Sequence, residues 1–201
     1  MEKEARRPIG RPRKSPNELA TKDKILYLAT ELFIEKGYSL VSMDDIAKHC
    51  NVTRATVYYY YNNKNELFTE AMIQLMVRIK QQIMRKLSTE EPLRKRLFNL
   101  AKAHMEATAE MDINSFMKDA KISLSPEQVK LMEISEDEMY TALENTLQEE
   151  MDKGKIPFRN ARLQAVSFVA LLTAGKGFME ERDLDDLIEE ILDLFWYGIS
   201  H

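Results

Sequence analysis

Residues 54–60 place a cation, a hydroxyl and several phenols within two helical turns, and such groups bind the phosphates and base edges of nucleic acid. Arg54 and Thr56 lie off the apolar stripe that begins at Val57. The four consecutive tyrosines at 58–61 are too many for the core of one short helix, and solvent alone would not favour them. The pattern favours a surface that contacts DNA over a helical hairpin packed inside a core.

Residues 43–61 can position these groups as a helix-turn-helix, in which two short helices cross closely. Ala47 is the small residue that a close crossing needs, and Asn51 suits the left-handed backbone of a turn four residues later. The apolar residues that would lock the two helices together are Val52, Val57 and Tyr61.

The charges at two helix starts point to the same surface. Helix N-termini favour acidic residues, yet Arg54 directly follows the predicted cap Thr53, and Lys64 directly follows the predicted cap Asn63. Each cation is unfavourable there by about 0.3–1 kcal/mol. A phosphate clamp, formed by a helix start and a cation, would explain why they are tolerated, and chance surface charge is the alternative.

Three runs of residues resemble the DNA-binding domain of TetR-family regulators. They are residues 25–38, 42–47 and 52–68, and their order and spacing hold over about residues 22–70. Asn51 stands where the family usually has glycine, and both residues tolerate the turn.

The resemblance implies a homodimeric repressor that binds a roughly palindromic operator in double-stranded DNA and releases it on binding a small molecule. Tyr60 and Tyr61 stand where histidine and phenylalanine are frequent in the family, which could shift base preference. By position, the resemblance also implies which residues contact DNA. Backbone phosphates would be contacted by Thr53, Thr56, Tyr58 and Lys64, base edges by Arg54, Ala55 and Tyr59, and either by Tyr60.

The first 16 residues are predicted to be a basic tail that is disordered without a partner. Residues 1–14 hold six cations against two acids. Residues 10–13 resemble the core of an AT-hook, in which Arg11 and Arg13 would enter a narrow A·T minor groove. The alternative is a generic polybasic tail that adds salt-dependent affinity.

The remaining pattern predicts an all-α chain of about nine helices, because long stretches without breakers carry apolar residues three or four apart. We expect a basic tail at 1–16, a three-helix DNA-binding domain at 17–70, and a ligand-binding and dimerisation domain at 71–201.

The net charge of the whole chain, −4, argues mildly against a protein that binds nucleic acid. However, the first 70 residues hold 12 cations and 10 acids, so the acidic excess belongs to the second half.

Several classes of protein are disfavoured. There is no P-loop or other cofactor motif, the three histidines and Cys50 lack metal-ligand spacing, and the titratable residues are scattered, so we expect no cofactor, metal or catalytic site. A single cysteine fits the reducing cytoplasm. No stretch approaches the ~20 apolar residues of a membrane span, so no membrane partner is expected.

Two apolar stripes near the C-terminus predict a dimer interface, formed as a four-helix bundle with the symmetry mate. The alternative is that both stripes belong to the intramolecular core. The first stripe is Leu163, Val166, Ser167, Ala170, Leu171 and Ala174, and the second is Leu187, Ile188, Ile191, Leu194 and Phe195.

Ten of the twelve methionines follow residue 70, which suits a pliable pocket for an apolar or aromatic effector, although methionine is equally an ordinary core residue. His104 lies on an apolar stripe and is more often a satisfied core histidine than a ligand contact. The candidate pocket residues are His104, Met105, Phe116, Met139, Tyr140 and Phe168. Three other functions remain open. The protein could be an activator or architectural DNA binder without an inducer, or a module that binds another protein. It could also be a helical enzyme, which would need a cluster of titratable residues in place of the scattered charges of the second half.

Overall fold

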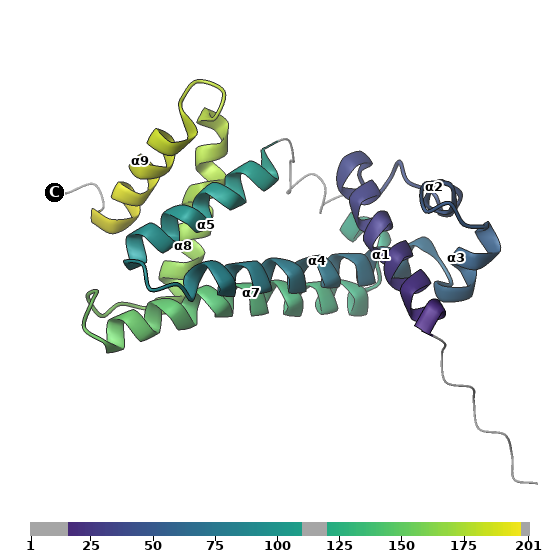
Figure 1. The fold of residues 1–201 in the computed structure, drawn as a ribbon, viewed down its shortest axis with the longest axis horizontal. Helices are drawn as coiled ribbons and strands as arrows, with labels where there is room; N and C mark the ends of the chain where they lie inside the picture. The colour runs from purple at the N-terminus through teal and green to yellow at the C-terminus, as the bar shows by residue number, and fades with distance from the viewer. Residues whose placement is uncertain (1–15, 110–119, 198–201) are drawn as a thin grey trace, which may run out of the picture.

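The computed structural model describes residues 16–109 and 120–197, and every regular element within these ranges is a helix, which confirms the all-α prediction (Figure 1). The elements are α1 (Pro16–Lys36), α2 (Met43–His49), α3 (Arg54–Tyr60), α4 (Lys64–Leu87), α5 (Leu93–Thr108), α7 (Pro126–Asp152), α8 (Ala161–Gly175), the 3-10 helix η1 (Lys176–Phe178) and α9 (Leu184–Tyr197).

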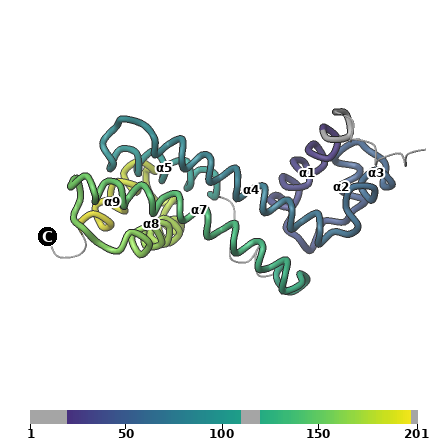
Figure 2. The backbone as a smooth tube through the Cα atoms, turned by 90° about the horizontal axis from the view of Figure 1, so that it is seen from below, coloured from purple at the N-terminus to yellow at the C-terminus, as the bar shows by residue number. Residues whose placement is uncertain are grey.

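The helices form an elongated molecule with two separate apolar cores. Helices α1–α3 lie at one end, α5, α8 and α9 lie at the other, and α4 runs from one end to the other (Figures 1 and 2). Helix α7 packs along α4 and also packs against α8. Because α4 contributes buried residues to both cores, it is the mechanical link between the two ends.

The turns of the first three helices follow from single residues. Gly37 ends α1 at φ 81°, and Asn51 adopts φ 53° between α2 and α3, as the sequence predicted. The side chains of Ser42, Thr53 and Asn63 cap α2, α3 and α4 by accepting a hydrogen bond from a backbone N–H in the first turn. These local signals set the directions of three helices within some 20 residues of sequence.

The first core is not closed by the first 70 residues alone. It contains the buried faces of α1 to α4, centred on Phe33, Phe68 and Ile46, together with Ala120 and Leu124 from the residues that precede α7. The second half of the chain therefore completes the hydrophobic core beneath the helix-turn-helix.

A buried ion pair joins the ends of three helices in the second core. Arg96 Nη2 lies 3.0 Å from Glu150 Oε1, and Arg96 Nη1 donates to the Leu87 carbonyl at 2.6 Å. Lys155 Nζ lies 3.3 Å from the other carboxylate oxygen. Burial raises the pKa of Glu150, but the hydrogen bonds from Arg96 and Lys155 outweigh it and hold the pKa below its ordinary value.

The ion pair predicts a large loss of stability for Glu150→Ala, because the substitution leaves the Arg96 guanidinium buried without its partner. We expect urea denaturation to show a loss of about 3–5 kcal/mol. Glu138→Ala, which removes the exposed Lys80–Glu138 pair between α4 and α7, should lose less than about 1 kcal/mol. Equal losses in the two variants would contradict this assignment.

The lowered pKa of Glu150 also predicts acid sensitivity. Its contribution to folding should be complete above the ordinary pKa of glutamate, about 4.3, and should be lost as the pH falls through the lower folded value. Unfolding free energies measured from pH 7 to pH 3 should therefore fall less steeply for Glu150→Ala than for the parent chain. Parallel curves would show that Glu150 is not a source of the acid sensitivity.

Candidate nucleic-acid interface

Helix α3 presents a polar and aromatic face from a buried apolar anchor. Val57 and Tyr61 are fully buried in the first core, whereas Tyr58 and Tyr59 are exposed. Helix α3 lies at the end of the molecule farthest from α9 (Figure 1). The other candidate contacts on α3 are either exposed, at Thr53, Arg54 and Ala55, or half-buried, at Thr56 and Tyr60. The arrangement leaves α3 with a cation, no acid and several hydrogen-bonding groups on its outer face.

The start of α3 is ordered by its own side chains. Thr53 Oγ1 accepts from the Thr56 backbone N–H at 3.1 Å, and the two hydroxyl oxygens lie 2.8 Å apart. The cap thus occupies the Thr53 oxygen and fixes both hydroxyls beside the first turn.

Arg54 is held on the surface by two neighbours. Its Nη1 lies 3.1 Å from Asp44 Oδ2, and its guanidinium lies 5.2 Å from the centre of the Tyr58 ring. An exposed ion pair of this kind contributes only about 0–1 kcal/mol, so a phosphate or a base edge can replace Asp44 at little cost. Sequence reasoning did not identify Asp44 as the partner of Arg54, because no local periodicity joins residues ten apart across a turn.

Lys64 occupies a more enclosed position at the start of α4. Its ammonium donates to the Tyr38 carbonyl at 3.0 Å and lies 4.0 Å from the centre of the Tyr38 ring. Burial lowers the pKa of Lys64. An ammonium has three N–H donors, so the hydrogen bond to Tyr38 leaves two donors for a phosphate. The same hydrogen bond fixes the position of the charge.

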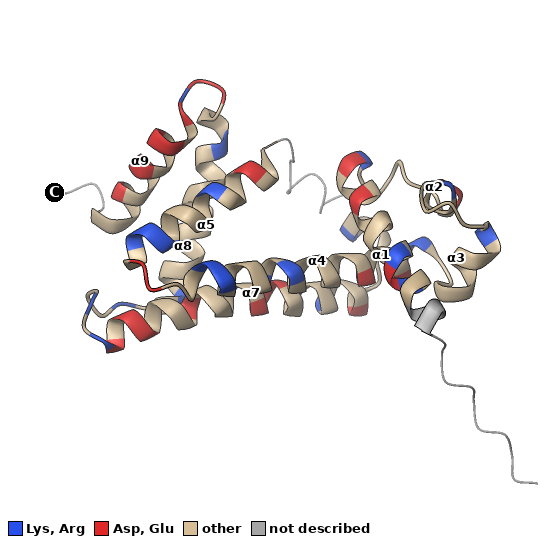
Figure 3. Ribbon diagram, viewed as in Figure 1, with Lys and Arg blue, Asp and Glu red and all other residues tan. Residues whose placement is uncertain are grey.

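The charges of the described residues are unevenly distributed along the molecule (Figure 3). Helix α9 carries five acids and no cation, whereas α3 carries one cation and no acid. The end that bears α3 is therefore the less repelled by a polyanion.

The candidate ligand residues of the second half lie in different environments. Met105 and Phe168 are buried in the second core, Met139 is half-buried, and half-buried Tyr140 lies under the Arg162 guanidinium. Phe116, like Arg11 and Arg13, lies outside the described residues.

His104 differs from the satisfied core histidine that the sequence favoured. It is half-buried, and its Nε2 is buried with no hydrogen-bond partner among the described residues. Burial, followed by the nearby Lys176 charge, lowers the pKa of His104. A neutral imidazole is therefore favoured at this position.

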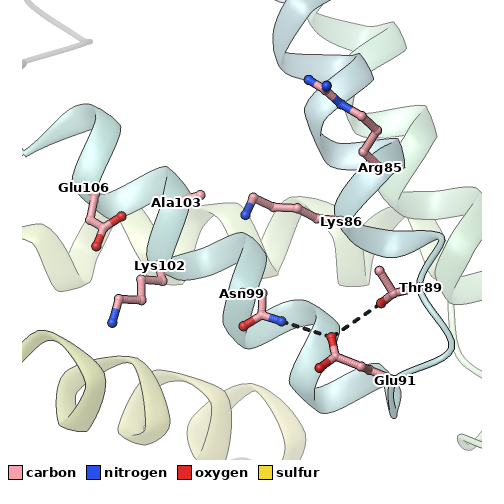
Figure 4. Close-up of a pocket in the computed structure, with 8 residues that line it drawn as sticks. All are labelled: Arg85, Lys86, Thr89, Glu91, Asn99, Lys102, Ala103 and Glu106. Atoms are coloured by element: carbon pink, nitrogen blue, oxygen red, sulfur yellow. Dashed lines mark hydrogen bonds between the residues drawn. The ribbon is translucent and has the colours of Figure 1, made fainter.

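A cavity of about 400 Å³ lies between the end of α4 and α5, and most of the residues that line it are polar or charged (Figure 4). Lys86 reaches from α4 toward α5, and the Glu91 carboxylate accepts from Asn99 at 3.1 Å and from Thr89 at 3.5 Å. The lining residues are Arg85, Lys86, Thr89, Glu91, Asn99, Lys102, Ala103 and Glu106. None of them belongs to the apolar set expected from the sequence.

The two C-terminal stripes have different environments. On α8, Leu163, Val166, Ala170 and Ala174 are exposed and face away from the core, Ser167 is half-buried, and half-buried Leu171 packs against the second core. On α9 the prediction needs correction, because Leu187, Ile188 and Ile191 are buried in this chain's own core, where α9 packs on α5 and α8. For these three residues the intramolecular alternative holds. Leu194 remains exposed, and half-buried Phe195 packs on Phe168 with ring centres 5.3 Å apart.

Among the described residues, no helix is long and apolar enough to cross a membrane. The same part of the chain contains no group of three or more histidine, cysteine or acidic side chains that could hold a metal ion.

Comparison with known proteins agrees with the helix-turn-helix geometry. Residues 25–71 match the family described as bacterial regulatory proteins, tetR family. This part of the chain, from α1 to the first turns of α4, is similar to that family. It is 45% identical over 51 residues to the biofilm operon icaADBC negative transcriptional regulator IcaR of Staphylococcus epidermidis, covering 25% of this chain and 28% of that protein. It is 32% identical over 103 residues to the uncharacterized HTH-type transcriptional regulator YhgD of Bacillus subtilis, covering 50% and 54%.

These matches span between about a quarter and about half of the length of the curated relatives. The solved structures extend the likeness of the fold to almost the whole chain. FadR of Bacillus subtilis in complex with stearoyl-CoA aligns with a TM-score of 0.71 at 19% identity, covering 89% of this chain and 100% of that one. FadR of Bacillus halodurans aligns with a TM-score of 0.72 at 20% identity, covering 94% and 100%. At these identities the likeness shows the fold alone.

Proposed function

We propose that the protein is a homodimeric, ligand-responsive transcriptional repressor that binds a palindromic operator through α3. The observation that carries the proposal is the orientation of α3, whose buried Val57 anchors a helix with Arg54, Tyr58 and Tyr59 on its outer face. A helix presented in this way fits the major groove, and a dimer would place two such helices on successive half-sites.

Two kinds of DNA contact are assigned to the candidate residues. Thr53, Thr56, Tyr58 and Lys64 would contact backbone phosphates, while Arg54, Ala55 and Tyr59 would lie nearest the base edges, with Tyr60 in either role. Arg11 and Arg13 would add contacts from the basic arm, in the minor groove or with phosphates.

The assignment predicts different behaviour for two cation variants. Lys64→Ala should weaken binding to all sequences and lower the salt slope by about one phosphate, whereas Arg54→Ala should also change the preferred sequence. The measurements are site selection from a random DNA pool and fluorescence anisotropy over a range of salt concentrations.

The matched control for these variants is Lys130→Ala, which removes one exposed cation from α7 and should leave both the affinity and the slope unchanged. If all three variants bind like the parent chain, α3 and the start of α4 are not the interface.

We assign the dimer interface mainly to α8. Its exposed stripe combines large apolar residues with small ones that permit close approach, and Leu163 is 64% exposed in the single chain. Leu194 of α9 is also exposed, while the buried residues of α9 pack in the second core.

The interface predicts that Leu163→Glu gives a monomer in sedimentation velocity, because a second copy cannot bury the new carboxylate without a partner. Leu131→Glu changes a similarly exposed leucine on α7 and should remain dimeric. A dimer that survives Leu163→Glu but not Leu131→Glu would move the interface to α7.

The effector is proposed to be an apolar or aromatic small molecule that binds the second half of the chain. The fold likeness to a structure solved with stearoyl-CoA makes a long-chain acyl-CoA the first compound to test. Such a ligand would lower operator affinity by binding more tightly to a conformation in which the two α3 helices do not fit the half-sites.

The effector proposal predicts that stearoyl-CoA weakens binding to the selected operator by at least about fivefold in anisotropy titrations. Coenzyme A without the acyl chain should have no effect, which separates apolar recognition from general competition by an anion. If neither stearoyl-CoA nor a panel of apolar and aromatic compounds changes the affinity, the protein is a constitutive DNA binder, as the activator and architectural alternatives require.

A further inference from the structure

Three polar side chains meet where the α1–α2 turn, the first turn of α4 and the residues before α7 come together. The Tyr38 hydroxyl donates to Asn65 Oδ1, and Asn65 Nδ2 donates to the Ser123 carbonyl at 2.5 Å. The Ser123 side chain is a further hydrogen-bonding partner of the Tyr38 hydroxyl. This Tyr38–Asn65–Ser123 cluster connects segments of the chain that are 27 and 58 residues apart.

Lys64 is attached to the cluster through both of its neighbours. It directly precedes Asn65, so any shift of Asn65 moves the start of α4 on which Lys64 stands. Its ammonium rests on the Tyr38 ring and donates to the Tyr38 carbonyl. The position of one cation therefore depends on the same tyrosine that Asn65 holds by its hydroxyl.

The cluster lies on a rigid apolar base. The Tyr38 ring packs edge-on against Phe68 with ring centres 4.9 Å apart, and Ala120 and Leu124 are buried in the same core. Burial raises the pKa of Tyr38, and the hydrogen bond with Ser123 opposes this only in part, so the hydroxyl stays a neutral donor at ordinary pH. A displacement of residues 120–125 would withdraw the Ser123 carbonyl from Asn65.

We propose that Tyr38 and Asn65 are positioning residues for DNA binding, which hold Lys64 in place and make its position depend on the segment before α7. The inference rests on the proposed function, because it requires Lys64 to contact the DNA backbone. In this arrangement Tyr38 and Asn65 act on DNA only through Lys64 and the first turn of α4. They are therefore distinct from the contacts assigned to α3.

Two substitutions remove the hydrogen bonds with little change to the core. Tyr38→Phe deletes the hydroxyl and keeps the ring beneath Lys64, while Asn65→Ala deletes both bonds of the amide. Each should weaken binding to the selected operator by about three- to tenfold, the effect of one or more ordinary hydrogen bonds. Asn99→Ala, which truncates a half-buried amide bonded to Glu91 in the second half, should leave the affinity unchanged.

A double-mutant cycle with Lys64→Ala separates positioning from general loosening of the domain. If Tyr38 and Asn65 act through Lys64, Tyr38→Phe and Asn65→Ala should have little further effect in the Lys64→Ala chain. Urea denaturation of each variant, with far-UV circular dichroism at the binding temperature, checks that the chains compared are folded.

The inference would be overturned if both single variants bound the operator as tightly as the parent chain does. So would losses that add fully to that of Lys64→Ala, because a structural defect independent of Lys64 would produce them. Failure of the proposed function looks different, since the parent chain itself would then select no DNA sequence from a random pool.

Discussion

One continuous helix, α4, belongs to both apolar cores, and the rest of the structure depends on this constraint. Its 24 residues span about 36 Å at 1.5 Å per residue, with buried side chains at its first turns in one core and Leu87 in the other. A helix without a break does not absorb a displacement at one end. A movement at the end of α4 that packs on α5 and α7 must therefore displace the other end, which packs on the helix-turn-helix, unless the packing along α4 resists the movement.

The two ends of α4 are held in different ways, which favours movement at one of them. At the C-terminal end, Leu87 accepts from the buried Arg96, which is itself paired with Glu150. Breaking that pair would leave a buried charge uncompensated, so this end resists change. At the N-terminal end, the links to the second half are a neutral hydrogen bond from Asn65 and apolar contacts that include Ala120, Leu124 and Met132. These contacts cost less to exchange, so a rearrangement of the second half would be transmitted through residues 120–125.

The features that sequence analysis predicted correctly are those decided within one or two helical turns. The left-handed turn at Asn51, the cap at Thr53 and the burial of Val57 each follow from a residue's own backbone preference or from helical periodicity. The contacts that it missed join distant parts of the chain, as do Arg54 with Asp44 and Asn65 with Ser123. Periodicity also could not decide whether the α9 stripe meets its own chain or a second copy, because both need the same apolar spacing.

The burial of α9 changes how the proposed dimer would relate to DNA. If the apolar stripes of both α8 and α9 packed against a partner, the second core would lose the α9 residues that cover α5 and α8. With Leu187, Ile188 and Ile191 facing inward, α8 is the main helix left with an open apolar stripe. A symmetric contact centred on one helix fixes the partner's position through few residues. The separation of the two α3 helices would then depend on the path from α8 through α7 and α4, and that path contains both the buried Arg96–Glu150 pair and the Asn65–Ser123 hydrogen bond.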